Sequence, residues 1–343
     1  MKNITVLGID LAKNVFQLHG TDQKGRCVLK KRLGREALIE YMAQLPKCLV
    51  GIEACGGAHY WARTFQAMGH QVKMMAPQFV KPYVRSNKND SNDAAGINES
   101  VTRPTMKFVP IKRIEQQDVL LMHRCRQLLI KQRTALSNQI RGLLAEYGVV
   151  IPQGISQIKM LCEILDGNKD KLTSRAVCVF SRLHEQFKAL DGEISIYDKE
   201  IELHANEDAQ CKEIQKLKGI GPITASAIVA TIGDPNVFKN GREVSAWLGL
   251  VPTQHSSGNK TRMGGISKRG DCYARTLLIH GGRSVVNVCE KKTDKLSLWV
   301  ADKKHRCGYN KAAVALANKN VRIIWAMLVT GEAYRPQQEP VTA

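Results

Sequence analysis

The segment Ile4-Thr-Val-Leu-Gly-Ile-Asp10 decides the fold of the N-terminal part of the chain. It is a β-branched, apolar run that ends on an acid, which is typical of a buried strand with a polar group at its end. Two more strands are predicted over 14–22 and 25–33, because only short, turn-like intervals separate these runs. Helices and strands then alternate, as helix 35–45, strand 48–53, helix 59–68, strand 71–76 and helices to about 103. This order predicts an α/β fold, a mixed sheet covered by helices.

The rest of the chain is predicted to be all-α. Met122, Leu129, Leu136 and Leu143 recur every seven residues, and apolar residues alternate at spacings of 4 and 3 over 183–201. Such a seam is typical of a coiled coil or a long antiparallel helix pair, although one ordinary helical subdomain would give a similar pattern. A break at 148–154 would be the turn.

We therefore expect four parts. They are a sheet domain over 1–115, a helical coiled-coil connector over 116–208, a helical C-terminal domain over 209–335 and a flexible tail over 336–343.

The charge of the chain points to an anionic partner. The 343 residues include 51 Lys and Arg against 31 Asp and Glu, a net charge of +20. The excess lies at the two ends, +9 over 1–115 and +10 over 241–343. Nucleic acid is the commonest partner of so basic a chain; the alternative is a basic protein without a polyanion. No run approaches the roughly 18 to 20 apolar residues of a membrane span, so we expect a cytoplasmic protein with no membrane partner.

Four acids are the candidate metal ligands. Asp10 ends the first predicted strand and Glu53 the fourth, so their carboxylates would meet at adjacent carboxyl ends if these strands are neighbours. Asp90 and Asp93 are spaced i, i+3 at a predicted helix start and face the same way. Each acid alone is as well explained by a turn or a helix cap. Gathered in one place, four carboxylates suit two Mg²⁺ ions in phosphoryl transfer.

The segment Leu217-Lys-Gly-Ile-Gly-Pro-Ile-Thr-Ala225 is interpreted as the hairpin of a helix-hairpin-helix module. Gly219 and Gly221 permit a tight turn, and backbone N–H groups there, with Lys218 beside them, can hold a phosphate. The alternative is an αα turn that serves only packing.

A third candidate is the loop Ser256-Ser-Gly258, which is surrounded by cations. The cations are Lys260, Arg262, Lys268 and Arg269. An exposed hydroxyl in a positive field favours a bound phosphate. His255 is adjacent, but no triad-like His and Asp spacing accompanies the serines. The residues alone favour a phosphate-binding loop, with a serine nucleophile as the second interpretation.

Three motifs resemble one known family. Gly-Ile-Asp10-x-Ala-Lys, Ile-Glu53-Ala-Cys-Gly and Asn-Asp90-x-x-Asp93-Ala, in this order, resemble the N-terminal domain of DEDD-type transposases of insertion-sequence family 110. The segments 102–112 and 247–270 are also similar to that family, and the resemblance covers about 4–112 and 211–283. One departure is Gly96-Ile-Asn98, where the family usually has an Ala-rich stretch; we expect it not to touch the metal ligands.

The resemblance implies a ribonuclease-H fold of the Holliday-junction resolvase branch, with Mg²⁺ held by Asp10, Glu53, Asp90 and Asp93. It implies that Ser257 forms a transient covalent link to DNA, with Ser256 as a near-degenerate alternative. It also implies donor and target DNA, a structured guide RNA from the same element, and a homo-oligomer, a dimer or tetramer, with a composite site across subunits. The protein would be prokaryotic and associated with the nucleoid when it acts.

Three functions remain to be distinguished. The first is a DNA recombinase or transposase that uses the acids and the serine. The second is a metal-dependent junction nuclease, which needs no serine and forms no protein–DNA adduct. The third is a non-catalytic nucleic-acid-binding protein, which would make no Mg²⁺-dependent product.

Overall fold

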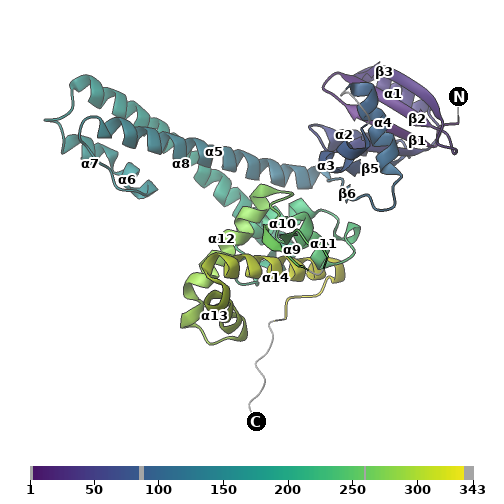
Figure 1. The fold of residues 1–343 in the computed structure, drawn as a ribbon. Helices are drawn as coiled ribbons and strands as arrows, with labels where there is room; N and C mark the ends of the chain where they lie inside the picture. The colour runs from purple at the N-terminus through teal and green to yellow at the C-terminus, as the bar shows by residue number, and fades with distance from the viewer. Residues whose placement is uncertain (1–2, 85–88, 259, 336–343) are drawn as a thin grey trace, which may run out of the picture. The chain divides into compact units, whose positions relative to one another are not determined.

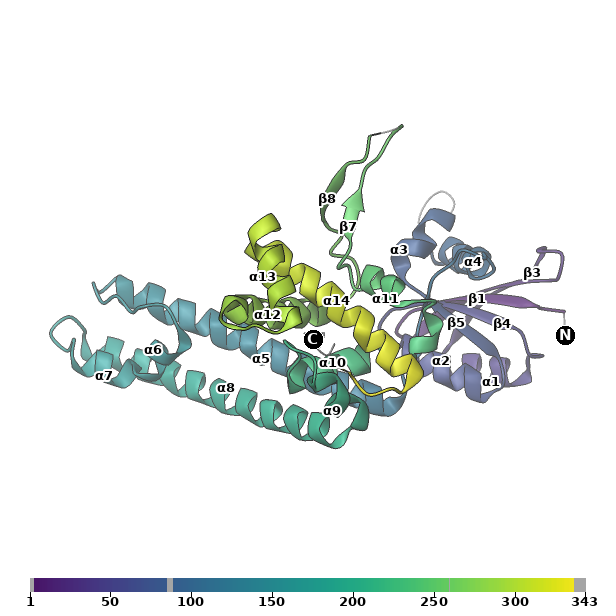
Figure 2. The same ribbon diagram turned by 90° about the horizontal axis from the view of Figure 1, so that it is seen from below.

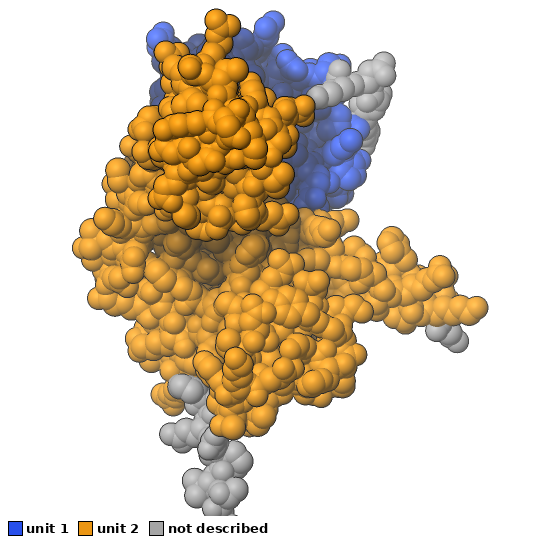
Figure 3. All heavy atoms as spheres, turned by 90° about the vertical axis from the view of Figure 1, so that its left-hand side faces the viewer, with its two compact units in different colours: residues 1–113 blue, residues 114–343 orange. Residues whose placement is uncertain are grey.

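The computed structural model describes residues 3–84, 89–258 and 260–335, so the tail predicted over 336–343 lies outside the described residues. The chain forms two compact units, Met1–Arg113 and Ile114–Ala343 (Figure 3).

The first unit is built on a mixed six-stranded sheet in the order β3-β2-β1-β4-β5-β6 (Figure 1). The first three strands form an antiparallel meander, β4 and β5 run parallel to β1, and β6 is antiparallel to β5. The strands are β1 (Val6–Leu11), β2 (Val15–Thr21), β3 (Cys27–Gly34), β4 (Leu49–Glu53), β5 (Gln71–Met75) and β6 (Phe108–Val109). The predicted mixed sheet is confirmed. The strand β6 was not predicted, because two paired residues leave no pattern in the sequence.

Helices cover both faces of this sheet. On one face α1 (Arg35–Gln44) and α2 (Ala58–Ala67) share a core with Leu7 and Ile9 of β1. On the other face lies α4 (Asp90–Val101), which follows the short helices α3 (Pro77–Val80) and η1 (Lys81–Tyr83).

The sequence explains the close seat of α4 on the sheet. Gly8 of β1 and Gly51 of β4 interrupt apolar runs on the face that α4 covers, and a Cβ at Gly8 would lie 2.4 Å from the Ala94 carbonyl oxygen. Buried Asn98 then fastens the helix, since its Nδ2 donates to the carbonyl oxygens of Val6 and His19, each at 3.0 Å. The segment Gly96-Ile-Asn98 thus serves packing.

The second unit begins with a long pair of helices, α5 (Ile114–Ala145) and α8 (Ser174–Glu207). The pair is antiparallel, because Arg126 pairs with Asp198 while Arg133, further along α5, pairs with the earlier Asp191. Two short helices, α6 (Ile155–Lys159) and α7 (Leu161–Asp166), pack at the far end of the pair (Figure 1). The helical arm, as we call residues 114–207, corresponds to the predicted connector.

The predicted seam is half right. On α8, Phe187, Ile194 and Ile201 are buried as expected. On α5, Leu143 is 41% exposed, whereas Met122, Leu129 and Leu136 are half-buried. The buried side chains of α5 are Val119, His123, Ser137, Ile140 and Leu144. The buried positions His123 and Ser137 were missed because they are polar, and a pattern of apolar residues does not include them.

The remainder of the second unit is helical around a core from α9, α10, α11, α12 and α14. Its elements are α9 (Ala209–Gln215), α10 (Pro222–Ile232), η2 (Pro235–Val237), α11 (Gly241–Trp247), α12 (Cys272–Val288), η3 (Cys289–Lys291), α13 (Lys295–Cys307) and α14 (Tyr309–Thr330), with the strands β7 (Pro252–Gln254) and β8 (Met263–Ile266). The β7–β8 hairpin projects from the helices of this unit (Figure 2). It was predicted as a loop.

The helix α14 is long and apolar enough to pass a length-and-composition test for a membrane span, and within the described ranges it alone does so. It is also a core helix of this unit, since Leu316, Val321 and Ile324 are fully buried in it.

Candidate active site

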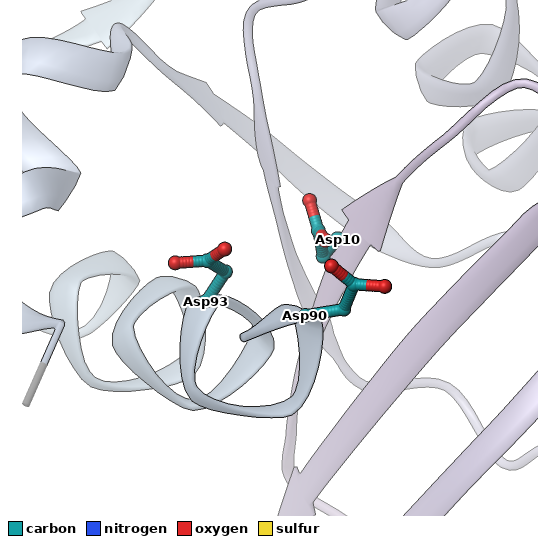
Figure 4. Close-up of side chains that lie close together, drawn as sticks. All are labelled: Asp10, Asp90 and Asp93. Carbon is teal, nitrogen blue, oxygen red and sulfur yellow. The ribbon is translucent and has the colours of Figure 1, made fainter. Parts of the chain in front are cut away.

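Three of the four predicted metal ligands lie together in the first unit. Carboxylate oxygens of Asp10, Asp90 and Asp93 lie within 4.8 Å of one another. Asp10 comes from the last part of β1 and the other two from the first turns of α4 (Figure 4). Asp10 and Asp93 are half-buried, and Asp90 is exposed.

The alternation of side chains along β1 explains why these carboxylates meet. Side chains on a strand alternate between faces, so Asp10 points to the same face as Gly8, the face that α4 covers. The close approach of α4 at Gly8 therefore also brings the start of α4 toward Asp10. The cap of α4 is Asn89, whose Oδ1 accepts from the Asn92 N–H at 2.8 Å. The helix is thus capped by its own asparagine, and a capping role does not explain Asp90 or Asp93.

Glu53 is the fourth predicted ligand and lies on the neighbouring strand. Ile9 of β1 pairs with Ile52 of β4 in parallel register, so Asp10 and Glu53 are the next residues along two adjacent strands. Glu53 is not in the group of carboxylates within 4.8 Å among the described residues. Burial, followed by the negative charges of Glu53 and Asp10, raises the pKa of the Cys55 thiol. Both carboxylates therefore lie close enough to Cys55, which follows β4, to raise the pKa of its thiol.

The donor set fits a hard divalent cation. All three clustered ligands are carboxylates, and such oxygens are what Mg²⁺ and Ca²⁺ prefer in proteins. Partial exposure leaves room for water to complete the coordination shell. A separate cavity of about 350 Å³ is lined by Leu11, Lys13, Arg35 and Cys55, among others, and the four acids are not among its lining residues.

The predicted serine loop lies in the second unit, at the tip of the β7–β8 hairpin. Ser257 and Lys260 form an isolated bridge there, and Gly258 has a φ of 57°, a left-handed conformation that suits glycine. The Ser256 hydroxyl accepts a hydrogen bond from Gln254 Nε2 at 2.9 Å. Among the described residues none hydrogen-bonds the Ser257 hydroxyl, which is exposed. The hairpin therefore presents Ser257 more openly than Ser256.

The root of the hairpin is fixed by a buried arginine that the sequence analysis missed. Arg275 is 7% exposed, and its Nη1 donates to the carbonyl oxygens of Leu248 at 3.0 Å and Arg269 at 2.7 Å. The four predicted cations line the hairpin and its root and are exposed; they are Lys260, Arg262, Lys268 and Arg269. The hairpin therefore carries an exposed serine hydroxyl and four exposed cations, which together give it a positive field.

The predicted helix-hairpin-helix turn connects α9 to α10. Gly219 has a φ of 84°, and a Cβ there would lie 2.6 Å from the Gly281 carbonyl oxygen of α12. Gly221 precedes α10, and a Cβ there would meet nothing within 4 Å. The Lys218 ammonium pairs with Asp294, and hydrogen bonds from that lysine and from Ser297 hold the pKa of Asp294 well below its usual range. Lys218 is thus engaged within the unit, while the Gly221 side of the turn is open.

Sequence reasoning also missed a buried polar group between the helical arm and the rest of the second unit. His123 of α5 is 1% exposed and bonds to Tyr273 Oη at 3.0 Å and Ser226 Oγ at 3.1 Å. Burial, then the nearby charges of Arg126 and His204, lowers the pKa of His123 to about 4. A histidine on a helix gives no signal in sequence that would tell a core position from an exposed one.

Comparisons with known proteins place the chain in a class. Residues 7–149 match the DEDD transposase model of the IS110 group, and residues 211–297 match a second model, described as the transposase IS116/IS110/IS902 family. Such proteins are transposases, enzymes that cut and rejoin DNA. The chain belongs to the IS116/IS110/IS902 transposase family.

Full-length relatives agree with this assignment. The chain is 46% identical to the "Transposase for insertion sequence element IS1111A" of Coxiella burnetii, with 98% of this chain and 92% of that protein covered. It is 45% identical to the "Probable family 20 transposase" of Pseudomonas aeruginosa, covering 97% and 99%. It is 38% identical to the "Transposase for insertion sequence element IS1328" of Yersinia enterocolitica, also covering 97% and 99%.

Proposed function

We propose that this insertion-sequence transposase cuts and rejoins DNA with two Mg²⁺ ions at Asp10, Glu53, Asp90 and Asp93 and with Ser257 as the nucleophile. The observation that carries the proposal is the cluster of Asp10, Asp90 and Asp93 within 4.8 Å, built by a helix that closes on the end of a strand. Divalent metal use follows from the DEDD transposase domain; the choice of Mg²⁺ and the number of ions are ours.

The chain's own groups have defined tasks in this proposal. The four carboxylates hold the metal, which when bound supplies positive charge for the attacking and leaving oxygens. Ser257 Oγ attacks the phosphorus of a DNA phosphodiester. The new Oγ–P bond forms as the bond from phosphorus to a nucleotide oxygen breaks; that oxygen takes up a proton, and the serine proton passes to a base or to solvent. Attack by a strand-end hydroxyl on the same phosphorus releases the serine and rejoins DNA.

The four cations of the hairpin support Ser257 in this role. A serine hydroxyl alone is a weak nucleophile, and it needs donors that meet the charge growing on the phosphate. Lys260 and Arg262 follow the serine along the hairpin, and Lys268 and Arg269 lie at its root. The open hydroxyl of Ser257, against the bonded one of Ser256, supports the choice between the two.

The finer structural assignments are also proposals. The strand order 3-2-1-4-5, with the last two strands parallel to the first, supports a ribonuclease-H-like fold for residues 1–115. The α9–α10 turn supports a helix-hairpin-helix in the domain 209–335, with the connector over 116–208. We further propose that a structured guide RNA joins donor and target DNA in the complex, and that the protein acts as a homo-oligomer in the cytoplasm. The two basic parts of the sequence support a nucleic-acid partner for each.

A joining assay tests the proposal. Purified protein is incubated with Mg²⁺, donor DNA and target DNA, with and without RNA from the flanks of the element. We expect joined products with Mg²⁺ and RNA and none with chelator. Denaturing gels should show a protein–DNA adduct in the wild type and in Ser256→Ala, and none in Ser257→Ala.

The rival functions give different results in the same assay. A metal-dependent nuclease would cleave without joining, and Ser257→Ala would keep full activity. A non-catalytic binding protein would make no product with any metal. An adduct lost in Ser256→Ala and kept in Ser257→Ala would move the nucleophile by one residue.

A further inference from the structure

A groove of about 1680 Å³ runs along α14 in the second unit, beside the β7–β8 hairpin. Its walls come from one face of α14, the starts of α11 and α13, strand β8 and the residues that follow α14; Figure 2 shows these elements. All the lining residues belong to one compact unit.

The groove is strongly basic. Eight Lys and Arg line it, against Asp294 and Glu332. Lys216 and Lys218 have carboxylate partners in Glu213 and Asp294. The other six have no carboxylate within 4.0 Å in the described part of the chain; they are Arg242, Lys295, Lys311, Lys319, Arg322 and Arg335. Unpaired cations in a concave surface concentrate an anionic ligand there.

Flat aromatic side chains lie among these cations. Trp299 has the ammonium of Lys319 at 4.7 Å and that of Lys303 at 5.9 Å from its ring centre. Trp325 is held in place, since its indole N–H donates to the Pro235 carbonyl oxygen at 3.0 Å. Tyr334 lines the groove as well and is half-buried. Fixed rings between cations are the surface that a stacked base and its phosphate require.

We propose that this groove binds a single-stranded segment of nucleic acid. A duplex offers phosphates but keeps the faces of its bases stacked inside, so it would use the cations and leave the aromatic rings without a partner. A single strand offers both. Because Gly264 and Ile266 of β8 line the groove, a strand lying in it leads to the hairpin that carries Ser257. The inference rests on the proposed function and adds a path by which an unpaired strand reaches the serine.

Binding of labelled oligonucleotides to the full chain tests the groove. Fluorescence anisotropy is measured with a 20-nucleotide single-stranded DNA, a single-stranded RNA of the same sequence, and the 20-base-pair duplex, over a series of salt concentrations. The charge variant is Lys311→Gln with Arg322→Gln, and the stacking variant is Trp299→Leu. The matched control is Arg175→Gln with Lys199→Gln, which removes two exposed cations from the helical arm. Thermal melts check that each variant is folded.

The two groove variants have different expected signatures. The charge variant should reduce the slope of log affinity against log salt by about 1.4 for single strands, since each lost phosphate contact is worth about 0.7. Trp299→Leu should weaken single-strand binding about tenfold and leave that slope unchanged, because stacking involves no counterion. The control should change neither, and the duplex should lose less than the single strands. The stronger of the DNA and RNA responses identifies the natural strand.

Several results would overturn the inference. Groove variants that bind single strands like the control exclude the site, as do equal losses for duplex and single strand. A change in sedimentation mass with unchanged oligonucleotide affinity would assign the groove to a second copy of the chain. The wild-type joining assay is read separately: joining by the groove variants at full rate rejects the groove alone, while salt and stacking signatures without any wild-type joining leave the groove standing and reject the proposed function.

Discussion

His123 should make the stability of the second unit depend on pH. Its pKa is lowered from 6.5 to about 4 in the fold, by burial first and then by the charges of Arg126 and His204. A depressed histidine pKa favours the neutral form, so its contribution is fully present above pH 6.5 and is lost as the pH falls toward 4. Between pH 7 and pH 5 this one side chain should cost the fold roughly 2 kcal/mol, because 1.36 kcal/mol accompanies each unit of pKa difference.

The perturbation that isolates this effect is His123→Gln. Glutamine keeps a donor and an acceptor for Tyr273 and Ser226 but does not titrate. Urea unfolding of the full chain is followed by tryptophan fluorescence at pH 7 and pH 5, and the loss of unfolding free energy is compared between wild type and variant. We expect the variant to lose about 2 kcal/mol less than the wild type. His280→Gln, an exposed histidine on α12, is the control and should behave as the wild type.

The comparison between proteins removes the contribution of other titrating groups, such as His19 and His184, whose pKa values burial also lowers. A difference between wild type and His123→Gln below about 0.5 kcal/mol would refute the reasoning, since it would mean that the imidazole is hydrated or charged in the fold. Direct NMR titration of the His123 ring gives a second reading, with a midpoint near 4 expected.

Four further outcomes are expected. Asp93→Ala should abolish joining, and 10 mM Mg²⁺ should no longer raise its melting temperature. A wild-type site whose Kd is about one tenth of this Mg²⁺ concentration would gain about 1.4 kcal/mol of unfolding free energy from the same ion. Ser257→Ala mixed with Asp10→Ala should recover part of the joining activity if subunits share their acids and serines, and no recovery would mean that one subunit supplies both. Gly221→Val should fold normally and weaken binding about tenfold across unrelated sequences, since backbone donors carry no sequence code, whereas Gly219→Val should unfold the turn against α12 and lower the melting temperature. Arg275→Met should cost about 3 kcal/mol of unfolding free energy, measured in urea, because two buried carbonyl oxygens lose a charged donor.

Much of the first unit could be predicted, because its strands are continuous apolar runs. The segment 4–10 is one residue away from the end of β1, and helix 35–45 matches α1 to within a residue. Asp10, Asp90 and Asp93 come together because α4 packs closely against Gly8 of β1. The positions of the acids in the sequence do not predict this contact. The sequence therefore indicated which acids are candidates, and only the fold shows why three of them meet.

The second unit was harder, because polar residues do structural work in it. His123, Ser137 and Arg275 are buried and hydrogen-bonded, so inferring burial from hydrophobicity missed these core positions. The β7–β8 hairpin escaped prediction because its strands are short and contain Pro252, Gly264 and Gly265, which have low strand propensity. The buried Arg275 holds the root of this hairpin, where it donates to the carbonyl oxygens of Leu248 and Arg269.

The helical arm gives this protein a fixed length. Its helix α5 has 32 residues, which at a rise of 1.5 Å per residue extends about 48 Å. On B-form DNA, at 3.4 Å per base pair, that is about 14 base pairs, or more than one full turn of the duplex. Interhelical ion pairs such as Arg133 with Asp191 stiffen the arm along this length. Any two contacts made by the root and the tip of one arm are therefore set on DNA at a spacing that the protein, and not the sequence it meets, determines.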